Sequence, residues 1–241
     1  MIVPRNPDVA RAAAGGQDTI GLRCPDHPVA LALLRAAARH GVLGVAAPSA
    51  NRFGRISPTR AEHVMGEFAD DDLWVLDGGA CEVGIESAIV DCSRAHPVLL
   101  RPGRLTRDDL EAAAGEPIRW SRPEAPDPSA PRASGTLLAH YAPRAKVRLM
   151  SAQDIAHKLQ ALGPHANNLG LWSAVRPDDG AGLGAGVLWR AQPQMAEQAA
   201  HALFSVLRDL DARGVQQIWV QLPPDTPEWE GVRDRLQRAA A

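Results

Sequence analysis

Two blocks in which short apolar runs alternate with helix-like patterns flank a proline-rich segment, residues 116–143. Strands that alternate with helices favour a largely parallel α/β sheet, because each crossover lays a helix over the sheet. The segment between the blocks has little periodicity and contains six prolines, which disfavour helices and central strands. We therefore predict two α/β domains, residues 1–119 and 146–241, joined by an extended linker, residues 120–145, that is exposed and mobile over 121–132.

Local signals place the secondary structure within each block. In the first block, strands are predicted at 19–24, 44–48, 73–76, 87–90 and 98–100, and helices at 28–40, from Thr59, and from Thr106 to near Gly115. Thr59 with Glu62 and Thr106 with Asp109 are capping-box patterns. In the second block, strands are predicted at 147–150, 168–172 and 215–222, and helices at 151–162, 194–213 and 227–239, the last capped by Thr226.

Composition excludes several classes of protein. The formal net charge of −2 gives no overall signature of binding to nucleic acid or to an acidic membrane. Three cysteines without paired spacing, Cys24, Cys81 and Cys92, predict neither a disulfide framework nor a zinc site. The sequence shows no signal peptide and no apolar run as long as a membrane span, so we expect a soluble, cytoplasmic protein.

Four polar clusters interrupt the predicted strand ends of the first block, at 19–23, 49–57, 84–87 and 101–103. Ligands of open α/β sheets bind at such strand ends, and backbone amides with arginines suit an anionic ligand. Taken alone, the stretch 47–64 is equally compatible with an ordinary polar surface loop. Arg101 alone reads as a surface salt-bridge residue, and Glu86 as a surface residue, a general base or a magnesium ligand. His27, His63 and His140 lie nearest to the clusters, and none is assigned as a base.

A glycine-rich stretch, residues 180–186, superficially resembles a dinucleotide-binding fingerprint. It lacks an immediately following helix and an acidic residue at the expected distance, so a flexible loop is the better interpretation. The only lysines are Lys146 and Lys158, and the first block therefore contains no Walker-type phosphate loop.

Together the motifs resemble a known family. TIGLRCPDHP, APSAN followed by SPT, GGACEVGIESAIVD and LLRPG are similar, in order and spacing, to the YrdC-like domain of L-threonylcarbamoyladenylate synthases. LLAHYAPRAKVRL and LRDLDARGVQQIWVQLPPDTPEWEGVRDRL resemble the linker end and C-terminal domain of the two-domain members. The resemblance implies part of a twisted, YrdC-like α/β domain, a proline-rich linker and a small, parallel, Rossmann-like α/β domain.

The resemblance also implies a reaction, in which L-threonine, bicarbonate and ATP give threonylcarbamoyladenylate and pyrophosphate. The product would feed the threonylcarbamoyl-transfer machinery that modifies tRNA, and Mg²⁺ would be carried by the nucleotide. Contacts to ATP or the adenylate are implied for Thr19, Ser49, Asn51, Ser57, Arg101, His140 and Tyr141. Contacts to threonine are implied for Arg23, Ser87 and the backbone of Ala47. The segment His140–Tyr141 would fold over the nucleotide as a lid.

Two departures from the family pattern matter. Ser87-Ala88-Ile89-Val90-Asp91 stands where the family commonly has Ser-Thr-Val-Val-Asp, which removes one hydroxyl. The YrdC-like domain of the family also begins about 100 residues before TIGLR, whereas Thr19 lies close to the start of this sequence. We therefore expect an N-terminally truncated synthase with weak activity or none, and apolar sheet edges that promote aggregation or pairing with a partner.

Alternative readings stay open at this point. The chain could be a YrdC-like module that binds RNA weakly, although no basic face with interspersed aromatic residues is evident. It could be the carbamoyl-adenylate module of a hydrogenase-maturation carbamoyltransferase, although the C-terminal part matches the synthases instead. It could also be an inert remnant that folds without acting.

Overall fold

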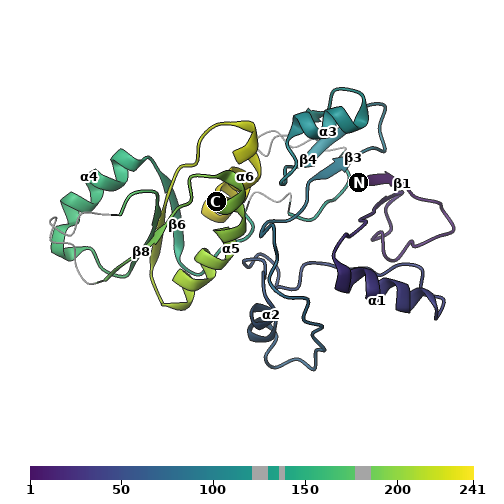
Figure 1. Cartoon of the computed structure of the whole chain (residues 1–241), viewed down its shortest axis with the longest axis horizontal. Helices are drawn as coiled ribbons and strands as arrows, with labels where there is room; N and C mark the ends of the chain where they lie inside the picture. The colour runs from purple at the N-terminus through teal and green to yellow at the C-terminus, as the bar shows by residue number, and fades with distance from the viewer. Residues whose placement is uncertain (121–129, 136–138, 177–185) are drawn as a thin grey trace.

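A computed structural model of the chain describes residues 1–120, 130–135, 139–176 and 186–241. The described residues form two lobes, each built on its own sheet, and α6 (Glu230–Ala240) lies at the centre, between the sheets (Figure 1). Of the predicted linker, residues 121–129, which make up most of the part expected to be mobile, and residues 136–138 lie outside the described residues. So does most of the glycine-rich stretch.

The first sheet has the strand order β2-β1-β3-β4-β5. Its strands are β1 (Ile2–Pro4), β2 (Thr19–Gly21), β3 (Ile89–Asp91), β4 (Val98–Arg101) and β5 (Arg119–Trp120). β1 runs antiparallel to β2, and β3 runs antiparallel to β4, whereas β1 and β3 are parallel to each other, as are β4 and β5. This sheet is therefore mixed rather than largely parallel, and its core is small, with Val90, Leu99 and Ile118 buried together.

The helices of the first lobe differ in how well the sequence predicts them. α1 (Pro28–Ala38) and α3 (Arg107–Ala114) form where expected, and Thr106 and Asp109 make the predicted capping box. The capping box predicted at Thr59 is absent, because α2 (Ala61–Glu67) begins two residues later, without a side-chain cap. Thr59 instead is buried, and its backbone amide donates to His63 Nδ1 at 3.1 Å.

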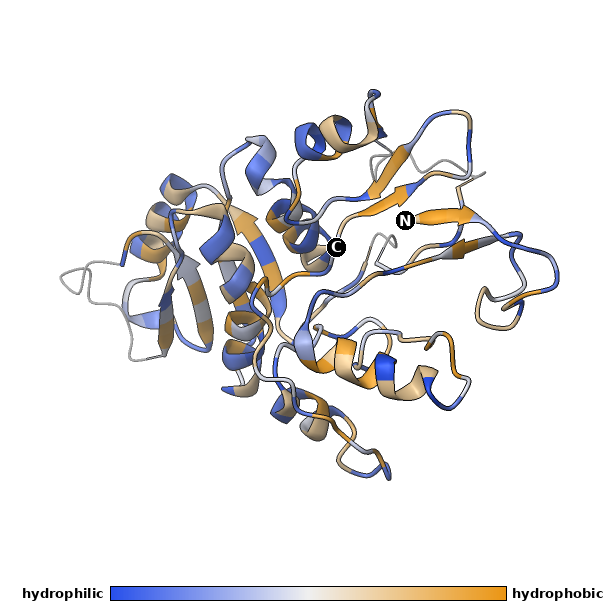
Figure 2. Cartoon of the chain, turned by 45° about the vertical axis from the view of Figure 1, so that its right-hand side comes forward, coloured by the Kyte–Doolittle hydropathy of each residue, from blue (hydrophilic) through white to orange (hydrophobic). Residues whose placement is uncertain are grey.

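Several apolar segments of the first lobe are poorly buried among the described residues. The strands predicted at 44–48 and 73–76 do not form among the described residues, and Leu43 and Trp74 are 93% and 95% exposed. α1 buries none of its residues, although its sequence is strongly apolar, as its colouring shows in Figure 2. An apolar run becomes a strand only where a neighbouring strand accepts its hydrogen bonds, and none is placed beside these segments here.

The second sheet is fully parallel, as predicted, in the order β6-β9-β7-β8. Its elements are β6 (Lys146–Met150), α4 (Ala152–Leu162), η1 (Gly163–His165), β7 (Leu169–Ser173), β8 (Val187–Ala191), α5 (Ala196–Ala212), β9 (Gln217–Gln221), η3 (Pro227–Trp229) and α6. Ser151 caps α4 through the Asp154 amide. The last helical segment opens with the 3₁₀ turn η3, and the predicted cap from the Thr226 side chain is absent.

The two lobes share one interior. The core built on α5, with Leu203, Phe204 and Leu207 fully buried, also includes Ile56 and Ile85 from the first lobe. The backbones approach so closely that a Cβ at Gly84 would lie 2.5 Å from the carbonyl oxygen of Ala200 in α5. Contacts at this distance leave no room for a layer of water, so the lobes are packed directly against each other.

Candidate functional site

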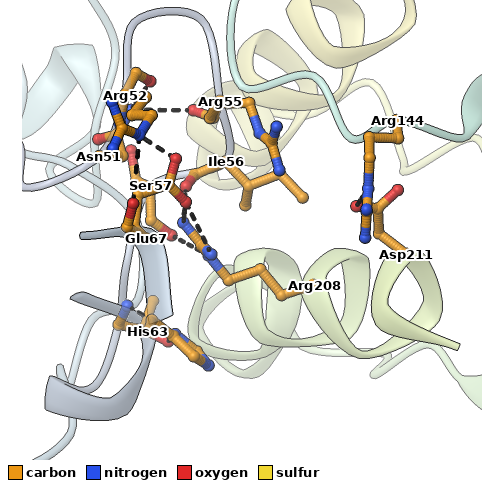
Figure 3. A network of polar contacts seen from close by, with 11 residues as sticks. Asn51, Arg52, Arg55, Ile56, Ser57, His63, Glu67, Arg144, Arg208 and Asp211 are labelled. Carbon is orange, nitrogen blue, oxygen red and sulfur yellow. Dashed lines mark hydrogen bonds and ion pairs between the residues drawn. The ribbon is translucent and has the colours of Figure 1, made fainter. Parts of the chain in front are cut away.

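The 51–57 loop is held by its own side chains and by the second lobe. The Asn51 amide donates to the carbonyls of Arg52 and Arg55, at 3.0 and 3.1 Å, which ties the loop into a compact turn. Arg208, from α5, donates to the carbonyls of Ile56 and Ser57 and pairs with Glu67 at 3.4 Å (Figure 3). Ser57 is thereby placed at the interface between the lobes, where it is buried.

A polar cleft of about 650 Å³ lies beside this network, between the loop and α5. Arg55 and Arg144 line it on one side and Arg208 on the other, and Asp211 pairs with Arg144 at 3.2 Å (Figure 3). Burial lowers the pKa of Arg208, and the carboxylate of Glu67 partly offsets this effect. The guanidinium therefore stays charged and serves to fasten the loop to α5.

Glu86 is neither a surface residue nor a free carboxylate. Its Oε1 accepts a hydrogen bond from Ser57 Oγ at 2.5 Å, and its Oε2 accepts one from Arg235 Nε at 2.9 Å. Burial alone raises the pKa of this carboxyl, but the charge of Arg235 and the hydrogen bond from Ser57 outweigh it, so the pKa lies below its ordinary value. A carboxylate occupied in this way is poorly suited to act as a general base or a metal ligand.

Arg101 is buried, with only 3% of its surface exposed, and the surface salt-bridge reading was wrong. Its guanidinium donates twice to the carbonyl of Ser87, at 3.1 and 2.9 Å, and once to that of Ser134, at 2.9 Å. It makes no ion pair within the described part of the chain. Burial and the nearby charge of Arg235 both lower its pKa. A buried guanidinium that pairs with no carboxylate among the described residues retains its positive charge for an anion.

Residues 140–142, at the end of the linker, pack against the 51–57 loop, α5 and α6. Tyr141 adopts a left-handed backbone conformation with φ of 62°, is 1% exposed, and packs on Phe204 with ring centroids 5.2 Å apart. The amide of Ala142 donates to the Gly54 carbonyl, and that of His140 to the Arg238 carbonyl. A Cβ at Gly135 would collide with the Tyr141 hydroxyl, which shows how closely the linker segments meet.

The structure thus brings together only some of the residues proposed from sequence. Ser57, Ser87, Arg101, His140 and Tyr141 gather where the linker meets both lobes. Five proposed residues remain. Asn51 braces the 51–57 loop through the carbonyls of Arg52 and Arg55. The other four have no side-chain hydrogen bond or ion pair to that group among the described residues: Thr19, Arg23, Ala47 and Ser49. Thr19 instead lines a separate cleft of about 500 Å³ near the edge of the first sheet. Arg23, Ala47 and Ser49 are exposed.

Sequence reasoning missed Arg208 and Arg235, which act across the interface. Each is separated from its partners in the first lobe by more than 130 residues, so no local spacing could reveal them. Within the described residues, no group of three or more histidine, cysteine or acidic side chains is placed to hold a metal ion. None of the helices described is both long and apolar enough to cross a membrane.

Comparison with known proteins identifies the family. Residues 105–241 match the family model described as the C-terminal domain of threonylcarbamoyl-AMP synthase. The chain belongs to the threonylcarbamoyl-AMP synthase family. Residues 1–103 match a second family model, described as telomere recombination. The family assignment makes the chain an enzyme of the threonylcarbamoyl-AMP synthase type, as the motif resemblance implied.

Relatives named threonylcarbamoyl-AMP synthase match along the chain. The Bacillus subtilis protein is 33% identical over all of this chain and 68% of its own length, and the Pyrococcus abyssi protein is 30% identical over all of this chain and 69% of its own. The Schizosaccharomyces pombe protein is 30% identical over 98% of this chain and 60% of its own length.

Solved structures of this threonylcarbamoyl-AMP synthase family agree with the fold. The crystal structure of P. abyssi Sua5 complexed with L-threonine matches with a TM-score of 0.84 at 30% identity, over 99% of this chain and 69% of that chain. A double variant of the same P. abyssi protein matches with a TM-score of 0.85 at 29% identity, over 99% of this chain and 68% of that chain. The two-lobed α/β architecture is therefore that of the family.

Proposed function

We propose that the chain catalyses formation of L-threonylcarbamoyladenylate and pyrophosphate from L-threonine, bicarbonate and ATP, as a step towards threonylcarbamoyladenosine in tRNA. The observation that carries the proposal is the family match along the chain, together with the gathering of Ser57, Ser87, Arg101 and Tyr141 at one place. The threonine-bound P. abyssi structure supports threonine as the amino-acid substrate. We place the reaction in the cytoplasm, with Mg²⁺ carried by ATP.

The reaction depends on the positioning of its substrates more than on reactive side chains. The threonine amine forms a carbamate with the carbon of bicarbonate and water leaves. A carbamate oxygen then attacks the α-phosphorus of ATP while pyrophosphate leaves. Aligning these anions and stabilising their charge supplies most of the acceleration. Arg101 carries the charge for this task, because its guanidinium is buried, donates to the carbonyls of Ser87 and Ser134, and pairs with no carboxylate among the described residues.

We assign the remaining candidates in two groups that follow the family motifs. The threonine group is Arg23, the backbone of Ala47, and Ser87. The nucleotide group is Thr19, Ser49, Asn51, Ser57, Arg101, His140 and Tyr141. In the second group, His140 and Tyr141 act as a cover over the nucleotide, a role supported by the docking of the linker against Gly54 and Phe204. The product passes to the tRNA threonylcarbamoyl-transfer machinery, and any direct RNA binding by this chain is weak.

We also propose that the 241-residue polypeptide, taken alone, has weak activity. Arg23, Ala47 and Ser49 stand exposed rather than gathered against Arg101, so the threonine and nucleotide contacts are incompletely organised. A tetra-anionic nucleotide held by so few organised cations binds loosely.

Threonine-dependent ATP–pyrophosphate exchange in the presence of bicarbonate tests both proposals. We expect slow exchange that requires threonine and is abolished in R101Q but retained in R119Q, since Arg119 is exposed on β5. Exchange without threonine, or neither exchange nor threonine binding, contradicts the proposed reaction. Exchange as fast as that of the full-length B. subtilis relative refutes weak activity while leaving the reaction intact.

A further inference from the structure

The most deeply buried charge at the interface is Arg235 in α6, whose side chain is 0% exposed. It reaches from the second lobe into the first and is bonded to two separate segments there. Its guanidinium donates to the carbonyl of Glu86 at 3.0 Å and to the carbonyl of Pro102 at 2.8 Å. One planar side chain therefore contacts both loops that flank the antiparallel pair β3–β4, and it adds a link from the second lobe to the bond that Arg101 already makes between them.

Those two carbonyls flank the residues proposed to bind ligand. Glu86 precedes Ser87, and Pro102 follows Arg101. Arg101 in turn donates to the Ser87 carbonyl, so consecutive carbonyls of the same loop are held by two different guanidiniums. A planar guanidinium with several donors fixes both distance and direction, whereas an ammonium group fixes little direction.

A third segment joins through the carboxylate of Glu86. Its two oxygens bridge Arg235 Nε and Ser57 Oγ, so the position of Ser57 also depends on Arg235. Asp234 balances the charge from the other side, accepting from Arg235 at 2.8 Å and pairing with Arg238 at 2.9 Å. The Tyr141 ring lies over the same guanidinium, with the centroid 5.7 Å from Cζ.

We propose that Arg235 is a positioning residue through which the second lobe sets Ser57, Ser87 and Arg101 in register for the threonine and nucleotide ligands. The assignment of those three residues as ligand contacts rests on the proposed function. If Arg235 only joined the lobes, its substitution would lower the free energy of unfolding without changing the threonine affinity of the folded protein. If Arg235 is a positioning residue, its substitution lowers the threonine affinity of molecules that remain folded.

R235K is the decisive variant, because it keeps the positive charge and loses the several directed donors. R233K is the matched control, two residues along α6, where Arg233 pairs with the exposed Asp225. L-threonine affinity is measured by isothermal titration calorimetry, below the melting temperature of each variant. We expect R235K to bind threonine about tenfold more weakly, as fits the loss of one charge-assisted hydrogen bond, and R233K to match the unmodified chain.

Hydrogen exchange gives a readout that needs no ligand. The backbone amides over residues 84–90 and 101–104 exchange faster in R235K than in R233K if Arg235 holds these loops. Equal threonine affinity and equal exchange in the two folded variants overturn the proposal. If the unmodified chain binds no threonine, the proposed function fails, and the exchange comparison alone decides whether Arg235 positions the loops.

Discussion

Gly231, near the start of α6, offers a test of how closely the two lobes must pack. A Cβ at this position would lie 2.5 Å from the carbonyl oxygen of Gly103 and 2.9 Å from Ile85 Cδ1. The Ile85 methyl can turn away, but the Gly103 carbonyl belongs to the turn that Arg235 holds through Pro102. G231A therefore forces α6 away from the first lobe.

The required movement can be set against the hydrogen bonds that it would stretch. Opening the contact with Gly103 from 2.5 Å to an ordinary 3.4 Å separates the backbones by 0.9 Å. A displacement of this size along the 2.8 Å bond from Arg235 to the Pro102 carbonyl lengthens it to 3.7 Å, too long for a hydrogen bond. Losing one or two charge-assisted bonds, less the gain from replacing a helical glycine, gives a net loss of about 2–4 kcal/mol.

Urea unfolding and differential scanning calorimetry measure the effect, and G66A is the control. Gly66 lies in α2, and a Cβ there meets nothing within 4 Å. The same substitution should then raise the free energy of unfolding by about 0.5–1 kcal/mol through helix propensity. We expect the two substitutions to change the free energy of unfolding in opposite directions, with the melting temperature of G231A lower by about 5–15 °C. A stabilised G231A would refute the close packing of α6 on the 101–103 turn.

Three further predictions concern the same interface and the open surface of the first lobe. The folded pKa of Glu86 lies below its ordinary value of 4.5. The contribution of Glu86 to the free energy of unfolding is therefore complete above that value and is lost as pH falls through the folded pKa. Urea unfolding between about pH 7 and pH 3 should show this loss, and E86Q should reduce the dependence of the free energy of unfolding on pH. R208Q leaves the Glu67 carboxylate without its ion-pair partner and should lower the free energy of unfolding by about 2 kcal/mol. R213Q, at an exposed ion pair, should change the free energy of unfolding by under about 1 kcal/mol. Equal losses would contradict a role for Arg208 at the interface. W74Q should leave unfolding within about 0.5 kcal/mol of the unmodified chain but reduce self-association in sedimentation velocity; unchanged association would exclude this exposed side chain as its cause.

Local signals in the sequence predicted the second lobe well. Its helices and three of its four strands form close to the predicted ranges, whereas β8 was not predicted. Ser151 with Asp154 marks a helix start that forms as expected, because the two partners of the cap lie only three residues apart. The capping box at Thr106 succeeds for the same reason. At Thr59 the pattern failed, because tertiary contacts bury this residue and move the helix start to Ala61.

Long-range contacts set the limit of prediction in the first lobe. The apolar runs at 44–48 and 73–76 have the composition of strands, but pairing depends on a neighbour that no local pattern contains. Glu86 looked like a surface residue because its partner, Arg235, lies 149 residues away. Of the four polar clusters, 84–87 and 101–103 do flank strands β3 and β4, whereas 49–57 follows a predicted strand that does not form and 19–23 stays apart from Arg101. The contacts that bring 51–57, 84–87 and 101–103 together come from α5, α6 and the linker.

The arginine that α6 contributes makes the two lobes poor candidates for free exchange between relatives. A chimaera that took its second lobe from another synthase would inherit that lobe's own choice of residue at the place of Arg235, while Glu86 would stay behind in the first. Recombination within this family should therefore succeed only when donor and recipient carry a matching guanidinium and carboxylate. A substitution at Arg235 or at Glu86 therefore restricts which residues are tolerated at the other position.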